Sequence, residues 1–76
     1  YLKGVSDPSS REYAIVSAYN GGAGNVLKTF SSNRNQALQI INRSQPGLVY
    51  RDLTSKHPLA ESRRYLEKVM YFKQGY

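Results

Sequence analysis

Residues 20–24, Asn-Gly-Gly-Ala-Gly, are the cluster in this chain whose composition most suggests ligand binding. The bare backbone N–H groups of a glycine-rich loop before a helix attract phosphate and other anions. A phosphate loop, however, follows a strand and ends in Gly-Lys-Ser or Gly-Lys-Thr, and neither feature occurs here. Glycines between two helices also adopt positive φ angles and let backbones approach closely. Composition alone therefore favours a tight helix–helix turn.

The other side chains that could take part in chemistry lie further along the chain. His57 is the only histidine, and no Cys, Asp or Glu stands beside it at the spacing of a metal site. We therefore predict no metal site and no cofactor, and expect His57 to cap a helix or to be exposed. Arg63, Arg64 and Lys68 indicate either a solvated helix face or a surface that attracts carboxylates.

Helices must position these residues, because apolar residues recur at three and four spacing and no segment alternates with period two. Asp7 followed by Pro8 predicts the start of the first helix, with a competing capping box at residues 9–12. Gly21 and Gly22 predict its end. Further helices are expected at 24–30, from Asn33 to near Arg43, between Pro46-Gly47 and His57-Pro58, and from Pro58 into Tyr71-Phe72. The sequence therefore predicts an all-α protein.

Other expectations concern the start of the chain and the core. Residues 1–4 are typical of the last turn of a helix that begins upstream and is stopped by Gly4. Tyr50, Tyr71 and Phe72 are expected in the core or lining a groove. In the last helix, a stripe at three and four spacing is formed by Leu59, Ser62, Leu66, Val69 and Lys73, with Tyr65 and Met70 beside it.

Two longer motifs occur in order along the chain. Residues 14–27 include Ala-Tyr-Asn-Gly-Gly, and residues 60–69 read Ala-Glu-Ser-Arg-Arg-Tyr-Leu-Glu-Lys-Val. Both resemble motifs of the soluble-lytic-transglycosylase-like family, which has a lysozyme-like fold and cleaves bacterial peptidoglycan. Residues 50–58 further resemble its membrane-bound members, so that the resemblance covers the whole chain. It implies that residues 1–76 are the C-terminal part, the second half, of a lysozyme-like catalytic domain.

The resemblance also implies what this chain lacks. In the family, the helix with the catalytic Glu-Ser pair and a Gly-Leu-Met-Gln segment both precede these motifs, and neither is found here. Glu61-Ser62 repeats the dipeptide inside the second motif, and we interpret Glu61 as a solvated acid in the first turn of a helix. The parent protein is expected to be a lytic murein transglycosylase that cleaves the MurNAc-GlcNAc β-1,4 bond and forms a 1,6-anhydromuramoyl product. This chain alone is expected to be inactive.

Five residues receive roles from the resemblance. Tyr65 matches the tyrosine whose hydroxyl bonds to the missing glutamate. Tyr19 and Asn20 match residues that contact sugar, and Gly21 and Gly22 leave room for the glycan strand. Structural alternatives exist for three of them. Without the motifs, Tyr19 and Tyr65 are more typical of core tyrosines, and Asn20 of a helix C-cap residue.

The charge of the chain bears on its partners. Eleven Lys and Arg against five Asp and Glu give a formal net charge of +6, which favours anionic partners. One alternative is therefore a small basic helical module that binds nucleic acid or a protein. The basic residues are scattered from Lys3 to Lys73, however, and no helix-turn-helix pattern appears. The resemblance instead implies peptidoglycan glycan strands as the partner, and no nucleic acid.

The resemblance to membrane-bound members also predicts a location. It implies a periplasmic protein, held at the outer membrane only through a lipid anchor of the parent protein. Because half a domain leaves apolar helix faces without cover, we also expect self-association of the truncated chain.

Overall fold

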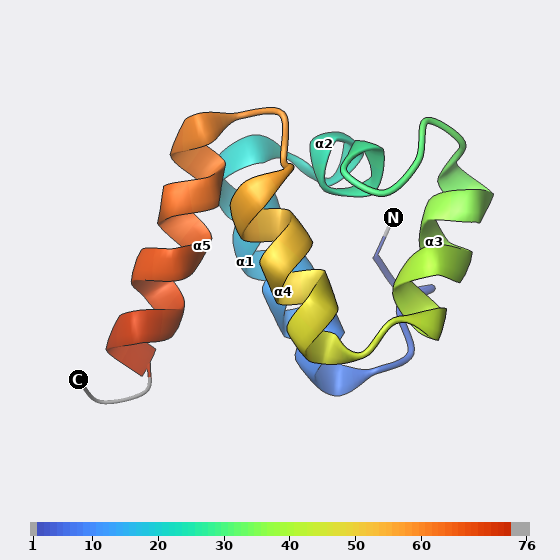
Figure 1. Cartoon of the computed structure of the whole chain (residues 1–76), viewed down its shortest axis with the longest axis horizontal. Helices are drawn as coiled ribbons and strands as arrows, with labels where there is room; N and C mark the ends of the chain where they lie inside the picture. The colour runs from blue at the N-terminus through green and yellow to red at the C-terminus, as the bar shows by residue number, and fades with distance from the viewer. Residues whose placement is uncertain (1, 74–76) are drawn as a thin grey trace.

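A computed structural model describes residues 2–73, in which the chain forms five α-helices joined by short connections. In chain order the helices are α1 (Pro8–Gly21), α2 (Ala23–Lys28), α3 (Arg34–Arg43), α4 (Pro46–Ser55) and α5 (Ala60–Lys73). Figure 1 shows α4 in front of α1, with α5 on one side and α3 on the other. No residue from 2 to 73 belongs to a strand, so the prediction of an all-α protein is confirmed.

Side-chain caps determine where α1 and α3 begin. The Asp7 carboxylate accepts a hydrogen bond from the Ser10 N–H at 2.8 Å, so Asp7, and not the capping box at residues 9–12, caps α1. The Asn33 side chain accepts from the Gln36 N–H at 3.0 Å at the start of α3. Both caps agree with the prediction, because capping is an interaction between residues close in sequence.

The central element is α1, which packs against α2, α4 and α5. Toward these neighbours it buries small side chains, those of Ser10, Ala14 and Ser17, which allow close approach of the helices. An ion pair between Glu12 and Lys73 also joins α1 to α5. The apolar core draws on all five helices and on the segment before α1: Val5, Ala14, Val26, Leu27, Ala37, Ile41, Val49, Leu53, Leu66 and Met70.

The segment before α1 is attached to α3. The Asn42 side chain in α3 donates to the Gly4 carbonyl at 2.9 Å and accepts from the Ser6 N–H at 3.0 Å. Val5, between these two contacts, is fully buried. Residues 3 and 4 form a turn, closed by a hydrogen bond from the Val5 N–H to the Leu2 carbonyl at 3.1 Å, and residues 2–73 do not test the helix expected before it. Tyr1, which belongs to the same expectation, lies outside the described residues.

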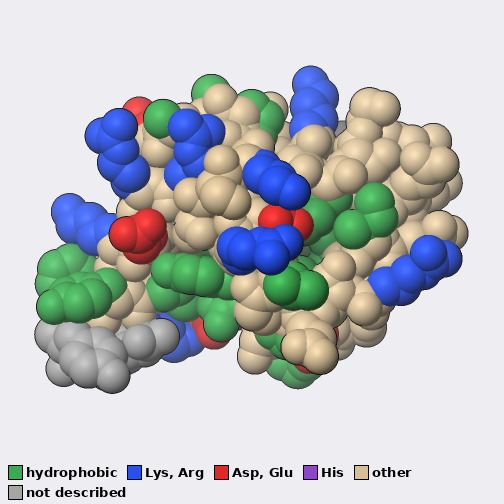
Figure 2. Space-filling view, viewed as in Figure 1, with side chains coloured by type: hydrophobic (Ala, Val, Ile, Leu, Met, Phe, Trp, Pro, Cys, Tyr) green, Lys and Arg blue, Asp and Glu red, His purple; other side chains and the backbone are tan. Residues whose placement is uncertain are grey.

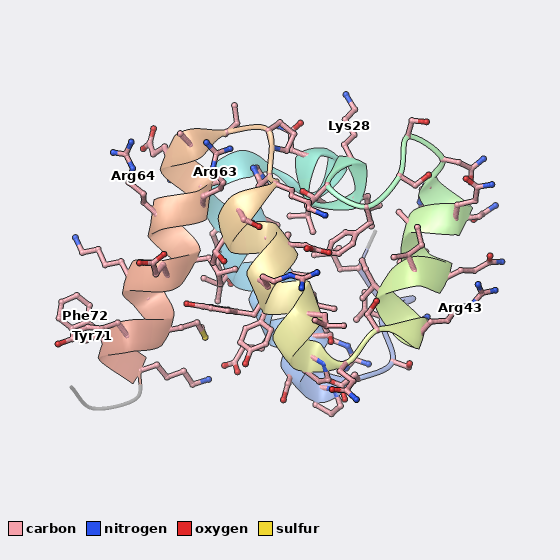
Figure 3. All side chains as sticks on the ribbon, viewed as in Figure 1. Lys28, Arg43, Arg63, Arg64, Tyr71 and Phe72 are labelled. Atoms are coloured by element: carbon pink, nitrogen blue, oxygen red, sulfur yellow. The ribbon has the colours of Figure 1, made fainter. Side chains whose placement is uncertain are left out.

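Two aromatic residues expected in the core or lining a groove are exposed, although Tyr71 lines a surface pocket with Arg64 and Lys68. Tyr71 and Phe72 expose 56% and 62% of their area, and their rings meet edge to face with centroids 5.7 Å apart (Figure 3). They lie where the end of α5 diverges from α4 (Figure 1), so no described helix covers them. Leu59 and Lys73, two members of the expected stripe, are also exposed, whereas Met70, expected beside the stripe, is buried. Tyr50 is half-buried, with its ring centroid 5.2 Å from that of Tyr13.

The longest described helices, α1 and α5, have 14 residues each, fewer than the roughly 20 that span a bilayer. Between residues 2 and 73, none has both the length and the apolar composition needed to cross one.

Candidate functional site

The candidate site is the corner where α1 ends, α2 begins and the first turn of α5 packs against Gly21. Gly22 alone separates α1 from α2 and has a φ of 83°. This backbone conformation is strained for residues with a side chain. The Gly22 N–H donates to the Ala18 carbonyl at 2.8 Å, which closes the last turn of α1. Gly22 is therefore required for the sharp change of direction between the two helices.

Gly21 is required for a different reason, which is close packing. A Cβ atom at this position would lie 2.4 Å from Ser62 Oγ and 2.9 Å from His57 Cε1. Both of those side chains are fully buried. The absence of a side chain at residue 21 therefore lets Ser62 of α5 and His57, in the connection before α5, lie directly against the end of α1.

Asn20 links the two motifs. Ser62 Oγ donates a hydrogen bond to Asn20 Oδ1 at 2.7 Å. Asn20 is an exposed residue in the last turn of α1, whereas Ser62 is fully buried in the first turn of α5. The C-cap of α1 is Gly22, so the alternative role of Asn20 as the C-cap residue is wrong. Asn25 adds a bond from α2, donating to the Gly21 carbonyl at 3.0 Å.

Two tyrosines neighbour this link in the sequence, Tyr19 next to Asn20 and Tyr65 one turn after Ser62. Tyr19 exposes 78% of its area, so the alternative of a core tyrosine is wrong for it. Tyr65 is half-buried and lies three residues after Ser62, about one helical turn along the same side of α5. Within residues 2–73, no hydrogen bond involves the hydroxyl of Tyr19 or Tyr65. The structure thus brings Asn20 and Gly21 to the helix of Tyr65, while Tyr19 points away from the core.

His57 completes the buried side of the corner. Its Nδ1 accepts the N–H of Leu59, the residue before α5, at 3.1 Å, and the ring is fully buried, so the alternative of an exposed ring is wrong. A neutral imidazole has one donor and one acceptor nitrogen, so Nε2 carries the proton. Nε2 is buried and has no hydrogen-bond partner among the described residues. Burial lowers the pKa of His57, and the positive charge of Arg63 lowers it further.

Arg63 and Arg64 differ although they are adjacent. Arg63 is half-buried and donates to the His57 carbonyl, so it ties α5 to the connection before it. Arg64 is exposed and points away from the helices (Figure 3). Of the two readings of this basic run, the solvated face fits Arg64, whereas Arg63 has a structural contact.

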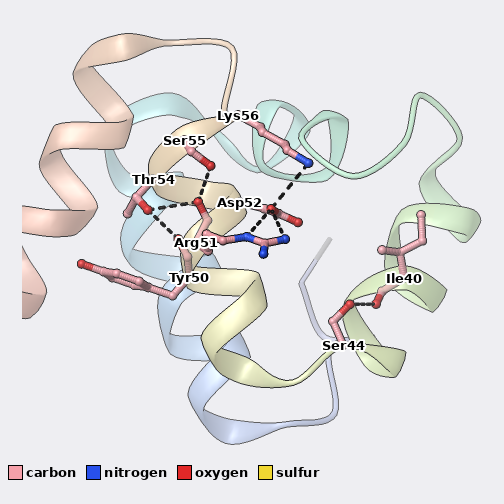
Figure 4. Close-up of polar contacts among 8 residues, drawn as sticks. All are labelled: Ile40, Ser44, Tyr50, Arg51, Asp52, Thr54, Ser55 and Lys56. Atoms are coloured by element: carbon pink, nitrogen blue, oxygen red, sulfur yellow. Dashed lines mark hydrogen bonds and ion pairs between the residues drawn. The ribbon is translucent and has the colours of Figure 1, made fainter.

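Basic side chains elsewhere are spread over the surface. Figure 2 shows Lys and Arg distributed over several helices without forming one stripe. On α4, Asp52 lies 3.4 Å from Arg51 and 3.8 Å from Lys56, which offsets part of the local positive charge (Figure 4).

Sequence reasoning missed Ser62 and His57 as members of the corner. Ser62 was expected only as a position of the last helix, and His57 only as a residue that caps a helix or is exposed. The available signal was that Ser62 lies inside the second motif, three residues before Tyr65. Its contact with Asn20 could not be read from spacing, because the two residues are 42 positions apart.

Comparison with known proteins gives homologues for the whole chain. No protein-family model matches it. Membrane-bound lytic murein transglycosylase C of Cronobacter sakazakii is 61% identical over 69 residues, which are 91% of this chain and 19% of that protein. The proteins of the same name from Serratia proteamaculans and Pectobacterium atrosepticum are 57% and 55% identical over all 76 residues, 21% of each.

The chain thus spans about a fifth of the length of these curated relatives. Lytic transglycosylases have a lysozyme-like helical fold, which agrees with the predicted fold class and with the five helices. From end to end, this chain is a homologue of one segment of membrane-bound lytic murein transglycosylase C.

Proposed function

We propose that residues 1–76 are the second half of a lytic transglycosylase domain and form part of its binding site for peptidoglycan glycan strands. The observation that carries this proposal is the hydrogen bond between Ser62 and Asn20. It joins the two family motifs, which are 42 residues apart in the sequence, at one corner of the fold. The name of the relatives, which contains murein transglycosylase, supports the same function.

The corner has the features that a sugar site needs. The exposed ring of Tyr19 provides a face on which a sugar can pack. Asn20 provides an exposed amide for hydrogen bonding to an N-acetyl group. The position of a Cβ on Gly22 has no atom within 4 Å, so this residue leaves open space beside the two side chains. Gly21 holds the site against α5.

The proposed reaction of the parent protein needs one carboxylic acid from outside this chain. That glutamate protonates the oxygen of the MurNAc-GlcNAc β-1,4 bond, and the leaving sugar departs with this proton. The resulting carboxylate accepts the proton of the muramoyl 6-hydroxyl as this oxygen bonds to C1, giving a 1,6-anhydromuramoyl product without water. The Tyr65 hydroxyl is proposed to bond to the glutamate. Glu61 is exposed in the first turn of α5, so it does not replace that acid and this chain alone is inactive.

The parent protein is proposed to act in the periplasm, anchored to the outer membrane by a lipidated N-terminus. The term membrane-bound in the relatives' name supports an envelope location. No described helix is suited to crossing a bilayer, and a lipid anchor requires none.

The test is an amide chemical-shift titration of the chain with an uncharged peptidoglycan glycan fragment, at moderate salt to screen nonspecific attraction. We expect shifts centred on Tyr19, Asn20 and Tyr65. Tyr19→Ala should remove most of the binding. Tyr71→Ala is the matched control, because Tyr71 is also an exposed tyrosine but lies at the far end of α5.

Two results would contradict the proposal. One is a folded chain whose resonances do not respond to glycan. The other is a chain that binds a short nucleic acid at the same salt concentration while ignoring glycan, which would favour the basic binding module.

A further inference from the structure

The Ser62 hydroxyl controls the direction of the Asn20 amide. Ser62 is fully buried, and its only proton is donated to Asn20 Oδ1 at 2.7 Å. The oxygen end of the amide is therefore held toward α5. The nitrogen end has no acceptor among residues 2–73, and Asn20 as a whole is exposed. The Asn20 amide therefore exposes its two N–H groups, which are hydrogen-bond donors, to solvent.

A second observation favours the same direction of the amide. His57 Nδ1 accepts the Leu59 N–H, so the proton of the ring is on Nε2. This buried Nε2 lies 3.1 Å from the Cβ position of Gly21, and Ser62 Oγ lies 2.4 Å from the same point. The buried side of the corner therefore carries donors. If the Asn20 amide were rotated by half a turn, its N–H groups would face these donors and its oxygen would face solvent.

The geometry also keeps Ser62 in place. The serine oxygen packs on Gly21, where a side chain would overlap it, and Leu66 fixes the next turn of α5 in the core. Asn20 is held on the other side by its position in the last turn of α1. The hydroxyl and the amide are therefore both carried by helices, α5 and α1, that pack against each other.

We infer that Ser62 is a positioning residue that fixes Asn20 as a hydrogen-bond donor and so selects sugars with an acceptor at this point, namely the carbonyl of an acetamido group. This inference rests on the proposed function and deepens it. A sugar with a hydroxyl in place of the acetamido group lacks that carbonyl. The site then loses one hydrogen bond, equivalent to about 2–10-fold in affinity.

The experiment compares two neutral ligands of the same linkage, the β-1,4 tetramers of N-acetylglucosamine and of glucose. Dissociation constants and the side-chain ¹H–¹⁵N resonances of Asn20 are measured by NMR titration. In the natural sequence, the N-acetylated tetramer should bind about 2–10-fold more tightly and shift the Asn20 side-chain pair. The glucose tetramer should leave that pair unmoved.

Three variants separate positioning from folding. Ser62→Ala should remove the preference between the tetramers and change the Asn20 side-chain resonances before any ligand is added. Asn20→Asp keeps an acceptor for Ser62 but has no donor, so it should lose the same preference. Ser17→Ala is the matched control, because Ser17 is a fully buried serine whose hydroxyl has no partner among the described residues. Thermal unfolding of each variant checks the fold, and Asn20→Asp carries the test if Ser62→Ala does not fold.

The outcomes distinguish the inference from the function on which it rests. Loss of the preference in Ser62→Ala and Asn20→Asp, with its retention in Ser17→Ala, supports the role of Ser62. A preference unchanged in Ser62→Ala, or Asn20 side-chain resonances that ignore the N-acetylated tetramer while the Tyr19 and Tyr65 amides shift, overturns the inference and leaves the proposed function standing. A folded chain that binds neither tetramer overturns both.

Discussion

The two adjacent motif glycines have separate purposes. Gly22 has a φ of 83° with open space around it, so its requirement is conformational. Gly21 is the last residue of α1 and faces Ser62 and His57, so its requirement is steric. Both requirements serve one result, which is the exposed placement of Tyr19 and Asn20 beside α5.

A substitution at Gly21 tests the steric requirement. Gly21→Ala should lower the free energy of unfolding by about 1–3 kcal/mol, because the added carbon overlaps Ser62 Oγ and overpacks a buried contact. Urea unfolding measures the change. Gly24→Ala is the control, because a Cβ at Gly24 has no atom within 4 Å and the residue lies within α2. The steric explanation fails if both variants are equally stable.

His57 makes the stability of the corner depend on pH. Its pKa is lowered in the folded protein by burial, so between that value and the unfolded value of about 6.5 the unfolded chain binds more protons. The stability that the neutral His57 ring contributes is therefore fully present above about pH 6.5, and it declines as the pH falls below this value. Nδ1 of a protonated ring could no longer accept a hydrogen bond from the Leu59 N–H. The protonated ring would also place a second positive charge beside Arg63.

Urea unfolding at pH 7.5 and at pH 5.5 measures this effect, with NMR titration of the imidazole in parallel. We expect lower stability at pH 5.5 and an imidazole pKa below the usual value. The comparison variant His57→Gln should show a smaller difference between the two pH values. An imidazole that titrates at or above its usual value would contradict the account.

At the scale of the helices, α5 has two parts with different surroundings. Its first part is held by the buried residues Ser62 and Leu66, and Met70 continues this face. Tyr71 and Phe72 lie in the part that diverges from α4 and are exposed. We propose that this aromatic end lets the truncated chain associate with itself, because adjacent exposed rings favour contacts that remove them from water.

Sedimentation over a range of protein concentrations tests that proposal. Phe72→Ser should shift the chain toward the monomer. Leu48→Ser is the control, because Leu48 is a partly exposed apolar residue on α4, away from this end of α5. A natural sequence that stays monomeric at the highest concentration would leave the aromatic end without this role.

At the scale of the whole molecule, the fold brings the two family motifs together, and the glutamate proposed for the reaction comes from outside this chain. Activity should therefore depend on the sequence that precedes these motifs in the relatives, which are about five times as long as this chain. A longer protein that adds the upstream half with its glutamate should release 1,6-anhydromuropeptides from sacculi, whereas the chain of 76 residues should release none. A folded longer protein without activity would refute the assignment.

In that longer protein, Tyr65→Phe should lower kcat more than it raises KM, because the hydroxyl is proposed to act on the acid during the reaction. Tyr50→Phe is the control, since Tyr50 is a half-buried tyrosine on α4 outside both motifs. An unchanged kcat in Tyr65→Phe would remove its supporting role.

The sequence by itself determined the features that depend on near neighbours. The caps Asp7 and Asn33, the glycines that end α1 and the spacing of apolar residues each act within a few positions, so the all-α class and most helix limits could be predicted. The two motifs also indicated the family, because their order and composition are visible without a structure. The candidate residues Tyr19, Asn20 and Tyr65 came from those motifs.

Only the tertiary structure decided which faces are covered and which polar groups meet. Tyr71 and Phe72 are aromatic residues of the kind that often lies in a core, but their burial depends on whether another helix lies against that end of α5. His57 is buried because Gly21 leaves room for its ring. Ser62 and Asn20 are 42 residues apart, and only the packing of α5 on α1 brings the hydroxyl to the amide. Such contacts arise from the three-dimensional arrangement of whole helices, which no local pattern encodes.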